Sequence, residues 1–261
     1  MTAPARAPLP PRPVLRAEVG LVLVLSLLYS AVFALLDIVR DLLQTKDLSN
    51  LATAPIVGSN YPGHPWLDLL SQLLYYGFAL APVWLVVHLA HRDGETARDI
   101  GIAWDAASKR TDVLRGAAVA AVVGGAGLGI YLVAHAVDAS LTVVPEDLPP
   151  VWWRVPILLV SALHSGLVEE IVMIGWLLRR FGQLGWGWWK AVIVSAVIRG
   201  GYHLYQGFGA FLGNAAMGVI FAYLWRRWDH RVLPLVIAHF FMDAVAYVGY
   251  AELHGHVSWL P

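Results

Sequence analysis

The sequence predicts an all-α polytopic membrane protein, a helical bundle of about seven transmembrane helices. Hydrophobic residues make up 58% of the chain and charged residues only 14%, whereas soluble domains are about 45–50% apolar and about 25% charged. The apolar residues form runs of about 18–25 residues, the length that a helix needs to cross a bilayer. The chain also holds twelve Trp and ten Tyr, residues that anchor helix ends at the membrane interface.

The predicted elements follow from these apolar runs. We expect residues 1–16, rich in Pro and Ala, to form a disordered cytoplasmic tail, and we expect no cleaved signal peptide because the next apolar run is too long for one. No internal repeat or second domain is evident, so we expect one helical domain over 17–251, followed by a short tail over 252–261. The seven spans are predicted near 17–37, 66–90, 113–136, 155–178, 188–206, 208–226 and 232–251.

Polar stretches justify the breaks between the spans. The stretch at 38–65 contains Asn, Pro and Gly, the stretch at 91–112 is charged, and Pro149 and Pro150 precede the fourth span. The third span is rich in Gly and Ala, as closely packed membrane helices often are.

The basic residues predict the orientation of the chain. With the N-terminus inside, fourteen Lys and Arg residues fall in the inner segments and three, Arg40, Lys46 and Arg154, in the outer ones. Cytoplasmic loops carry an excess of basic residues. We therefore expect a multi-pass protein of the cell membrane with a cytoplasmic N-terminus and, after seven spans, an external C-terminus.

Composition excludes several classes of function. Eighteen basic and eighteen acidic residues give a net charge of zero, so nothing supports nucleic-acid binding electrostatically. Without cysteine, the chain has no disulfide, no cysteine-ligated zinc and no thiol nucleophile.

Ionisable side chains inside the predicted spans are the candidates for function, because a charge at the bilayer centre costs about 2.5–3.5 kcal/mol or more. Residues four apart share one helix face, and adjacent residues point about 100° apart. We expect the polar faces of the fourth, fifth and seventh spans to pack around one polar chamber. These side chains are Glu169, Glu170, Arg199, His203, His239 and Asp243.

This set of groups suits hydrolysis. A glutamate in apolar surroundings can take a proton from water and give it to a leaving amine. One histidine can orient that water or hold a metal, and a second can stabilise an oxyanion. No serine has an obvious base beside it, so we assign Ser161, Ser165 and Ser195 to helix packing.

The pattern resembles the CAAX-protease and bacteriocin-processing family (CPBP, or Abi) of intramembrane endopeptidases, over roughly residues 155–250. The family's Glu-Glu motif begins here at Glu169. Its second motif, Phe-x-x-x-His, ends at His203. Its third, His-x-x-x-Asn, reads from His239 to Asp243.

Two arginines depart from the family's pattern. The family's first motif is Glu-Glu-x-x-x-Arg, but Ile174 stands at the arginine position, and Arg199 replaces the phenylalanine of the second motif. Our hypothesis is that Arg199 supplies the counter-charge to Glu170 that position 174 lacks. The alternative is that the altered motif marks a member with reduced or different activity.

The resemblance implies a role for each site residue. Glu169 would be the general base for water, assisted by His203. His239 and Asp243 would hold the tetrahedral oxyanion, and Glu170 would be a structural carboxylate. A metal stays open, because Glu169, His203 and His239 could ligate a divalent ion such as zinc or act on water without it.

The resemblance also implies partners: the lipid bilayer, and a hydrophobic or lipidated peptide such as a prenylated C-terminal peptide, a bacteriocin or a signalling peptide. Two other classes stay open, a non-catalytic membrane scaffold or bacteriocin-immunity protein and a proton-coupled transporter. Transporters usually carry polar sites in two repeats, whereas the polar groups here lie only in the C-terminal half. His203 lies about 20 Å along the fifth span, beyond the two glutamates. We therefore expect this span to bend near Gly200-Gly201, or to begin with Trp186, Trp188 and Trp189 lying along the interface.

Overall fold

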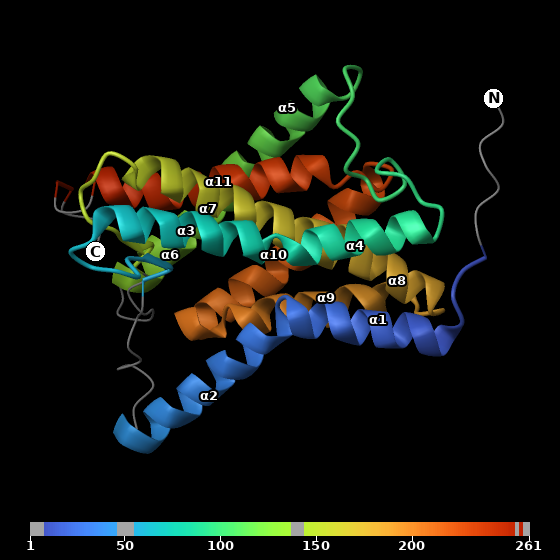
Figure 1. Ribbon diagram of the computed structural model, residues 1–261, viewed down its shortest axis with the longest axis horizontal. Helices are drawn as coiled ribbons and strands as arrows, with labels where there is room; N and C mark the ends of the chain where they lie inside the picture. The colour runs from blue at the N-terminus through green and yellow to red at the C-terminus, as the bar shows by residue number, and fades with distance from the viewer. Residues whose placement is uncertain (1–7, 46–54, 137–143, 254–255, 258–261) are drawn as a thin grey trace.

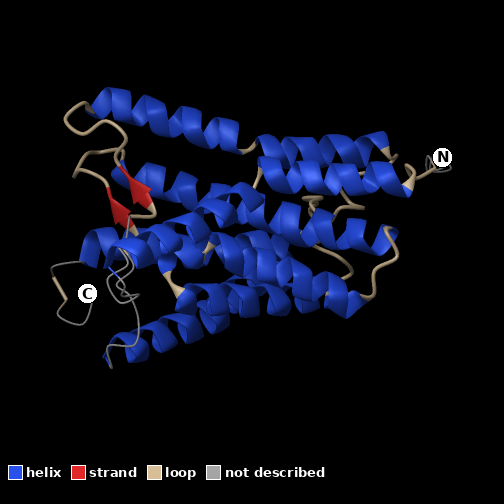
Figure 2. Cartoon of the chain, turned by 90° about the horizontal axis from the view of Figure 1, so that it is seen from below, coloured by secondary structure: helices blue, strands red, loops and turns tan. Residues whose placement is uncertain are grey.

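The computed structural model describes residues 8–45, 55–136, 144–253 and 256–257, and most of them are helical. Figure 2 shows the helices packed lengthwise, with one pair of short parallel strands near one end of the bundle. The helical elements are α1 (Arg12–Leu25), α2 (Leu28–Thr45), α3 (Pro65–Ala79), α4 (Ala81–Arg92), α5 (Lys109–Val119), η2 (Ala120–Gly124), α6 (Gly125–Ala136), α7 (Arg154–Glu169), η3 (Glu170–Leu177), α8 (Leu178–Gln183), α9 (Trp188–Tyr202), η4 (Leu204–Gln206), α10 (Phe208–Arg227) and α11 (Leu233–Leu253); the strands are β1 (Val57–Gly58) and β2 (Glu146–Asp147).

The lengths of the helices confirm an all-α, multi-span membrane fold. Within the described residues, five helical runs are long and apolar enough to cross a membrane. A sixth results if α1 and α2, which meet at an angle of 53°, form one bent span. The prediction of about seven spans differs at α9, because this helix has 15 residues and ends at Tyr202 rather than continuing to residue 206.

The N-terminal tail is shorter than the sequence predicts. Helix α1 begins at Arg12 and its second residue is Pro13, which suits the first turn of a helix because its φ is already helical. Leu15 is only 1% exposed, so its burial stabilises this turn. The expectation of disorder is therefore wrong for residues 12–16, while residues 1–7 lie outside the described part of the chain.

The run α7–η3–α8 is the centre of the bundle (Figure 1). Of its most apolar 18 residues, 67% are buried, against 6% for the run from Lys109 to Val133. Helix α7 packs along α11, and α9 packs along α10. The central run also contacts α3, α4 and α10, so its neighbours come from both halves of the sequence.

A glycine sets the closest contact between α7 and α11. A Cβ atom at Gly166 would lie 2.9 Å from the carbonyl oxygen of Val236 and 3.5 Å from the Cβ of His239. Only a residue without a side chain allows this approach. Because Gly166 lies one helical turn before Glu169 and Glu170, the same contact brings both carboxylates to α11.

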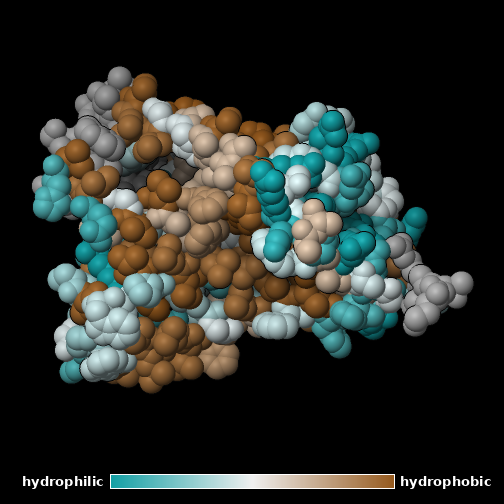
Figure 3. Space-filling model, turned by 90° about the horizontal axis from the view of Figure 1, so that it is seen from above, coloured by the Kyte–Doolittle hydropathy of each residue, from teal (hydrophilic) through white to brown (hydrophobic). Residues whose placement is uncertain are grey.

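Ion pairs fasten the end of the bundle at which α8 and α10 end. Arg180 Nη2 lies 2.6 Å from Asp93 Oδ2, and both side chains are at most 2% exposed. Arg231 pairs with the fully buried Asp112, which ties the turn before α11 to α5. Figure 3 shows the contrast on the surface: hydrophilic residues gather at the end of the bundle where the N-terminus lies, and hydrophobic residues cover much of the rest.

Candidate functional site

Two adjacent glutamates lie midway along the central run. Glu169 is the last residue of α7 and Glu170 the first of η3, a π-helical segment. π-helical turns inside α-helices occur frequently at functional sites. The run extends from Arg154 to Gln183, so at about 1.5 Å per residue both carboxylates lie about 20 Å from either end.

Glu170 is buried completely and is neutralised by an arginine. The guanidinium of Arg199 makes a two-point contact with the Glu170 carboxylate: Nη1 donates to Oε2 at 3.1 Å and Nη2 donates to Oε1 at 2.6 Å. The arginine is itself 1% exposed. Its stem passes Gly218 of α10, where an added Cβ would stand 3.1 Å from Arg199 Cδ. Such a planar, two-point contact is the strongest form of carboxylate pairing.

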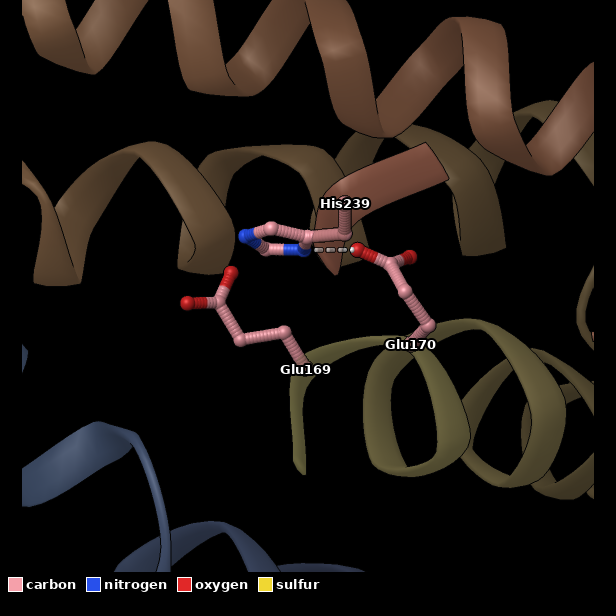
Figure 4. A group of neighbouring side chains, drawn as sticks. All are labelled: Glu169, Glu170 and His239. Atoms are coloured by element: carbon pink, nitrogen blue, oxygen red, sulfur yellow. Dashed lines mark hydrogen bonds and ion pairs between the residues drawn. The ribbon is translucent and has the colours of Figure 1, made fainter. Parts of the chain in front are cut away.

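His239 joins the two glutamates to the seventh predicted span. Its Nδ1 lies 2.7 Å from Glu170 Oε1, and its Nε2 lies 3.4 Å from Asp243 Oδ2, one helical turn further along α11. Figure 4 shows the imidazole ring with Glu170 at one edge and the carboxylate of Glu169 beside the other. Only 3% of His239 is exposed, so the ring is held within the bundle.

Glu169 has looser contacts than Glu170. The hydroxyl of Tyr202 donates to its Oε2 at 2.7 Å, while His203 Nε2 lies 3.5 Å and Arg199 Nη2 3.3 Å from the same oxygen. A carboxylate offers about four acceptor positions. These three contacts of Glu169 all involve Oε2, whereas the three contacts of Glu170 use both of its oxygens, so Glu169 keeps acceptor capacity at Oε1.

His203 lies directly after the last residue of its helix. Helix α9 begins at Trp188, continues through Gly200-Gly201 without a break and ends at Tyr202, and His203 caps it. The His203 side chain is 15% exposed, against 9% for that of Glu169. Its Nδ1 atom is buried without a hydrogen-bond partner among the described residues.

Two tyrosines extend the site beyond the residues found from the sequence. Tyr202 contacts Glu169, and the hydroxyl of Tyr247 lies 3.3 Å from Asp243 Oδ2. Tyr202 lies three residues after Arg199 and Tyr247 four after Asp243, so both share a helix face with a residue already chosen. This spacing is the signal that could have identified them.

The residues that converge as possible metal ligands differ from the predicted set. One ligand atom each of Glu169, Glu170 and His239 lies within 4.8 Å of the other two, so Glu170 takes the place expected for His203. Carboxylate and imidazole donors suit zinc and similar divalent ions. However, Arg199 Nη2 contacts all three residues, so a cation already lies among these ligands, and we assign no reaction step to a metal.

Comparison with known protein families finds a match in the part of the chain that contains this site. Residues 150–245 match the family described as "Type II CAAX prenyl endopeptidase Rce1-like". The matched range includes Glu169, His203 and His239. No curated protein and no solved structure matches the chain.

Proposed function

We propose that this chain, whose residues 150–245 match the Rce1-like type II CAAX prenyl endopeptidase family, hydrolyses peptide bonds of membrane-associated, hydrophobic or lipidated peptides. One observation carries the proposal: Glu169 is buried midway along a span with His203 and Tyr202 on the same oxygen and His239 beside it. In this proposal Glu169 is the base, His203 orients the water, and His239 is the N–H donor to the oxyanion.

Glu169 acts as the general base. A water between Glu169 and His203 gives a proton to the Glu169 carboxylate while its oxygen bonds to the carbonyl carbon of the peptide. The gap of 3.5 Å between His203 Nε2 and Glu169 Oε2 allows such a water to bridge both groups with little displacement. When the carbon–nitrogen bond breaks, Glu169 returns the proton to the leaving amine, so the carboxylate is regenerated.

His239 stabilises the oxyanion through its Nε2–H. Its Nδ1–H donates to Glu170, and the contact from Nε2 to Asp243 is long, at 3.4 Å, so in the protonated ring, where both nitrogens are donors, the Nε2–H is available to a substrate oxygen. An ionised carboxylate accepts hydrogen bonds but cannot donate one. We therefore give Asp243, which stands where the family has asparagine, the role of orienting the ring rather than of contacting the oxyanion.

Glu170 and Arg199 position the reacting groups. Their ion pair is buried on both sides, and each partner offsets the other's loss of hydration. Glu170 also fixes His239 through Nδ1. In this account Arg199 supplies the positive charge that the family places at the position of Ile174.

The charged end of the bundle supports the orientation that the sequence predicts. Basic residues favour the cytoplasmic side, and we place that end in the cytoplasm together with the N-terminus, so that the C-terminus is external. Arg154 begins α7 at the opposite end. The basic residues in α8, at the ends of α4 and α10 and in the turn before α11 are Arg92, Arg179, Arg180, Arg226, Arg227 and Arg231.

The experiment compares purified wild type with Glu169→Gln and His203→Ala on fluorogenic peptides, with and without a C-terminal prenyl group, in lipid nanodiscs. We expect Glu169→Gln to lower kcat/KM by about 10²–10⁴-fold, the usual contribution of a general base. Glu252→Gln, the same change at an exposed carboxylate of α11, is the matched control.

The folded state of each variant is checked by thermal melting and size exclusion. Full cleavage by a well-folded Glu169→Gln would contradict the proposal. Absence of cleavage by the wild type on every peptide, together with an intact cellular phenotype of that variant, would favour the non-catalytic scaffold instead.

A further inference from the structure

We propose that Arg199 is a tethered cation that fills a latent divalent-metal site formed by Glu169, Glu170 and His239. Removal of the guanidinium would convert this cluster into a metal site. The inference concerns the same residues as the proposed function but does not rest on cleavage, because metal content is measured directly.

The three residues have the properties of a metal site. Two carboxylates and one imidazole converge from the α7–η3 junction and from α11, with one ligand atom of each within 4.8 Å of the others. All three residues are at most 7% exposed, so bulk water does not compete for these atoms. Three protein ligands of this kind, together with one open position, are the usual arrangement of a zinc site.

One atom of Arg199 occupies the interior of this cluster. Its Nη2 lies 2.6 Å from Glu170 Oε1, 3.2 Å from His239 Nδ1 and 3.3 Å from Glu169 Oε2. A guanidinium nitrogen of this type carries two hydrogens, enough for one oxygen of each glutamate. His239 Nδ1 donates to Glu170 and accepts nothing from the guanidinium, so a metal ion would have to displace the proton of this nitrogen as well as the arginine.

The arginine excludes a second cation by charge and by volume. Arginine is not deprotonated in proteins, so the positive charge is permanent. Gly218 of α10 provides the space through which its stem reaches the cluster. A divalent ion would have to displace the side chain from a site where it is 1% exposed.

Loss of this charge leaves two buried carboxylates without the guanidinium that contacts both, which is unfavourable. A divalent cation would supply the missing charge and bind one atom of each of the three residues. The residue one helical turn after Glu170 is Ile174, which is uncharged. It therefore cannot neutralise Glu170 once the arginine is removed.

The test measures metal in purified wild type, Arg199→Met and Arg199→Lys after treatment with a chelator and dialysis against Co²⁺. We expect Arg199→Met to retain about one Co²⁺ per chain with the visible absorption of a low-coordinate site. Wild type and Arg199→Lys, in which a fixed positive charge remains, should retain only traces. Adding His239→Ala to Arg199→Met should abolish the binding.

Three results would overturn the inference. The first is stoichiometric Co²⁺ in the wild type that disappears in Glu169→Gln or His239→Ala. The second is a folded Arg199→Met that binds no metal. The third is an Arg199→Met protein that stays aggregated when produced and purified with Co²⁺ present, because the metal should replace the lost charge and raise its melting temperature.

Discussion

Two runs in this protein contain a π-helical segment, and the two segments have opposite surroundings. In η3 all eight residues are buried, whereas in η2 none is. Both segments contact α11, yet only η3 begins with a carboxylate. A π-helical segment therefore does not by itself mark a functional site. The site arises where such a segment holds an ionisable side chain against other helices.

The largest effect should follow from Glu170→Ala in η3. It leaves the buried Arg199 without its main partner, and breaking a buried pair in this way destabilises by about 3–5 kcal/mol. Val122→Ala in η2, at a side chain that is 71% exposed, should change stability by less than about 0.5 kcal/mol. Thermal melting in detergent micelles measures both.

The double variant Glu170→Leu with Arg199→Met removes both charges of that pair. It should regain part of the stability, because replacing both partners of a buried pair is often tolerated. Equal melting temperatures of wild type and Glu170→Ala would mean that the pair contributes nothing to folding.

Two glycines allow a similar comparison between a packed and an unpacked position of a helix. Gly166→Ala should destabilise by about 1–3 kcal/mol, because its Cβ would press on the Val236 carbonyl. Gly127→Ala in α6, where an added Cβ meets no atom within 4 Å, should be neutral or stabilise by up to about 1 kcal/mol. Melting temperatures in the reverse order would refute the close contact between α7 and α11.

A smaller effect is expected from Tyr202→Phe. Loss of one hydrogen bond to Glu169 corresponds to about 0.5–1.5 kcal/mol, or a decrease of roughly 2- to 13-fold in kcat/KM if the bond positions the base. Tyr223→Phe, at a tyrosine that is 62% exposed on α10, should leave the rate unchanged. A rate unaffected by Tyr202→Phe would limit Tyr202 to a structural contact.

The smallest effect concerns His230, in the turn between α10 and α11. Burial lowers its pKa, and the nearby Arg179 adds to this shift. Because the folded state favours the neutral ring, its contribution to stability is present above about pH 6.5 and is lost as the pH falls through the lower folded pKa.

His230→Asn should therefore flatten the decrease in melting temperature below about pH 6.5. Asparagine tolerates the positive φ of 63° at this residue. The exposed His91→Asn serves as control, and identical pH profiles for His230→Asn and wild type would show that the turn does not respond to pH.

The sequence predicts much of this site because buried charge is expensive in a membrane. That principle selects Glu169, Glu170, Arg199 and His239, and the structure brings all four into contact. It does not select Tyr202, because a tyrosine in a membrane protein normally indicates the interface. A π-helical segment also has no marker in the hydrophobic pattern, so η2 and η3 could not be predicted.

The errors in helix length have a related cause. Hydrophobicity shows where a helix can lie in lipid, but the ends depend on local contacts. Helix α9 ends at Tyr202, two residues after Gly200, where an added Cβ would lie 2.7 Å from the Phe211 carbonyl. The hydrophobic pattern does not reveal that contact, because the apolar run continues past it.

The short α9 has a consequence for the surrounding lipid. Its 15 residues span about 22 Å, whereas the hydrocarbon layer of a typical bilayer is about 30 Å thick. Lipids beside a helix of this length compress, or polar groups extend toward the headgroups. Local thinning of the bilayer beside His203 would bring the lipid headgroups closer to the site. A lipidated peptide could then reach Glu169 while its lipid tail stays among the acyl chains.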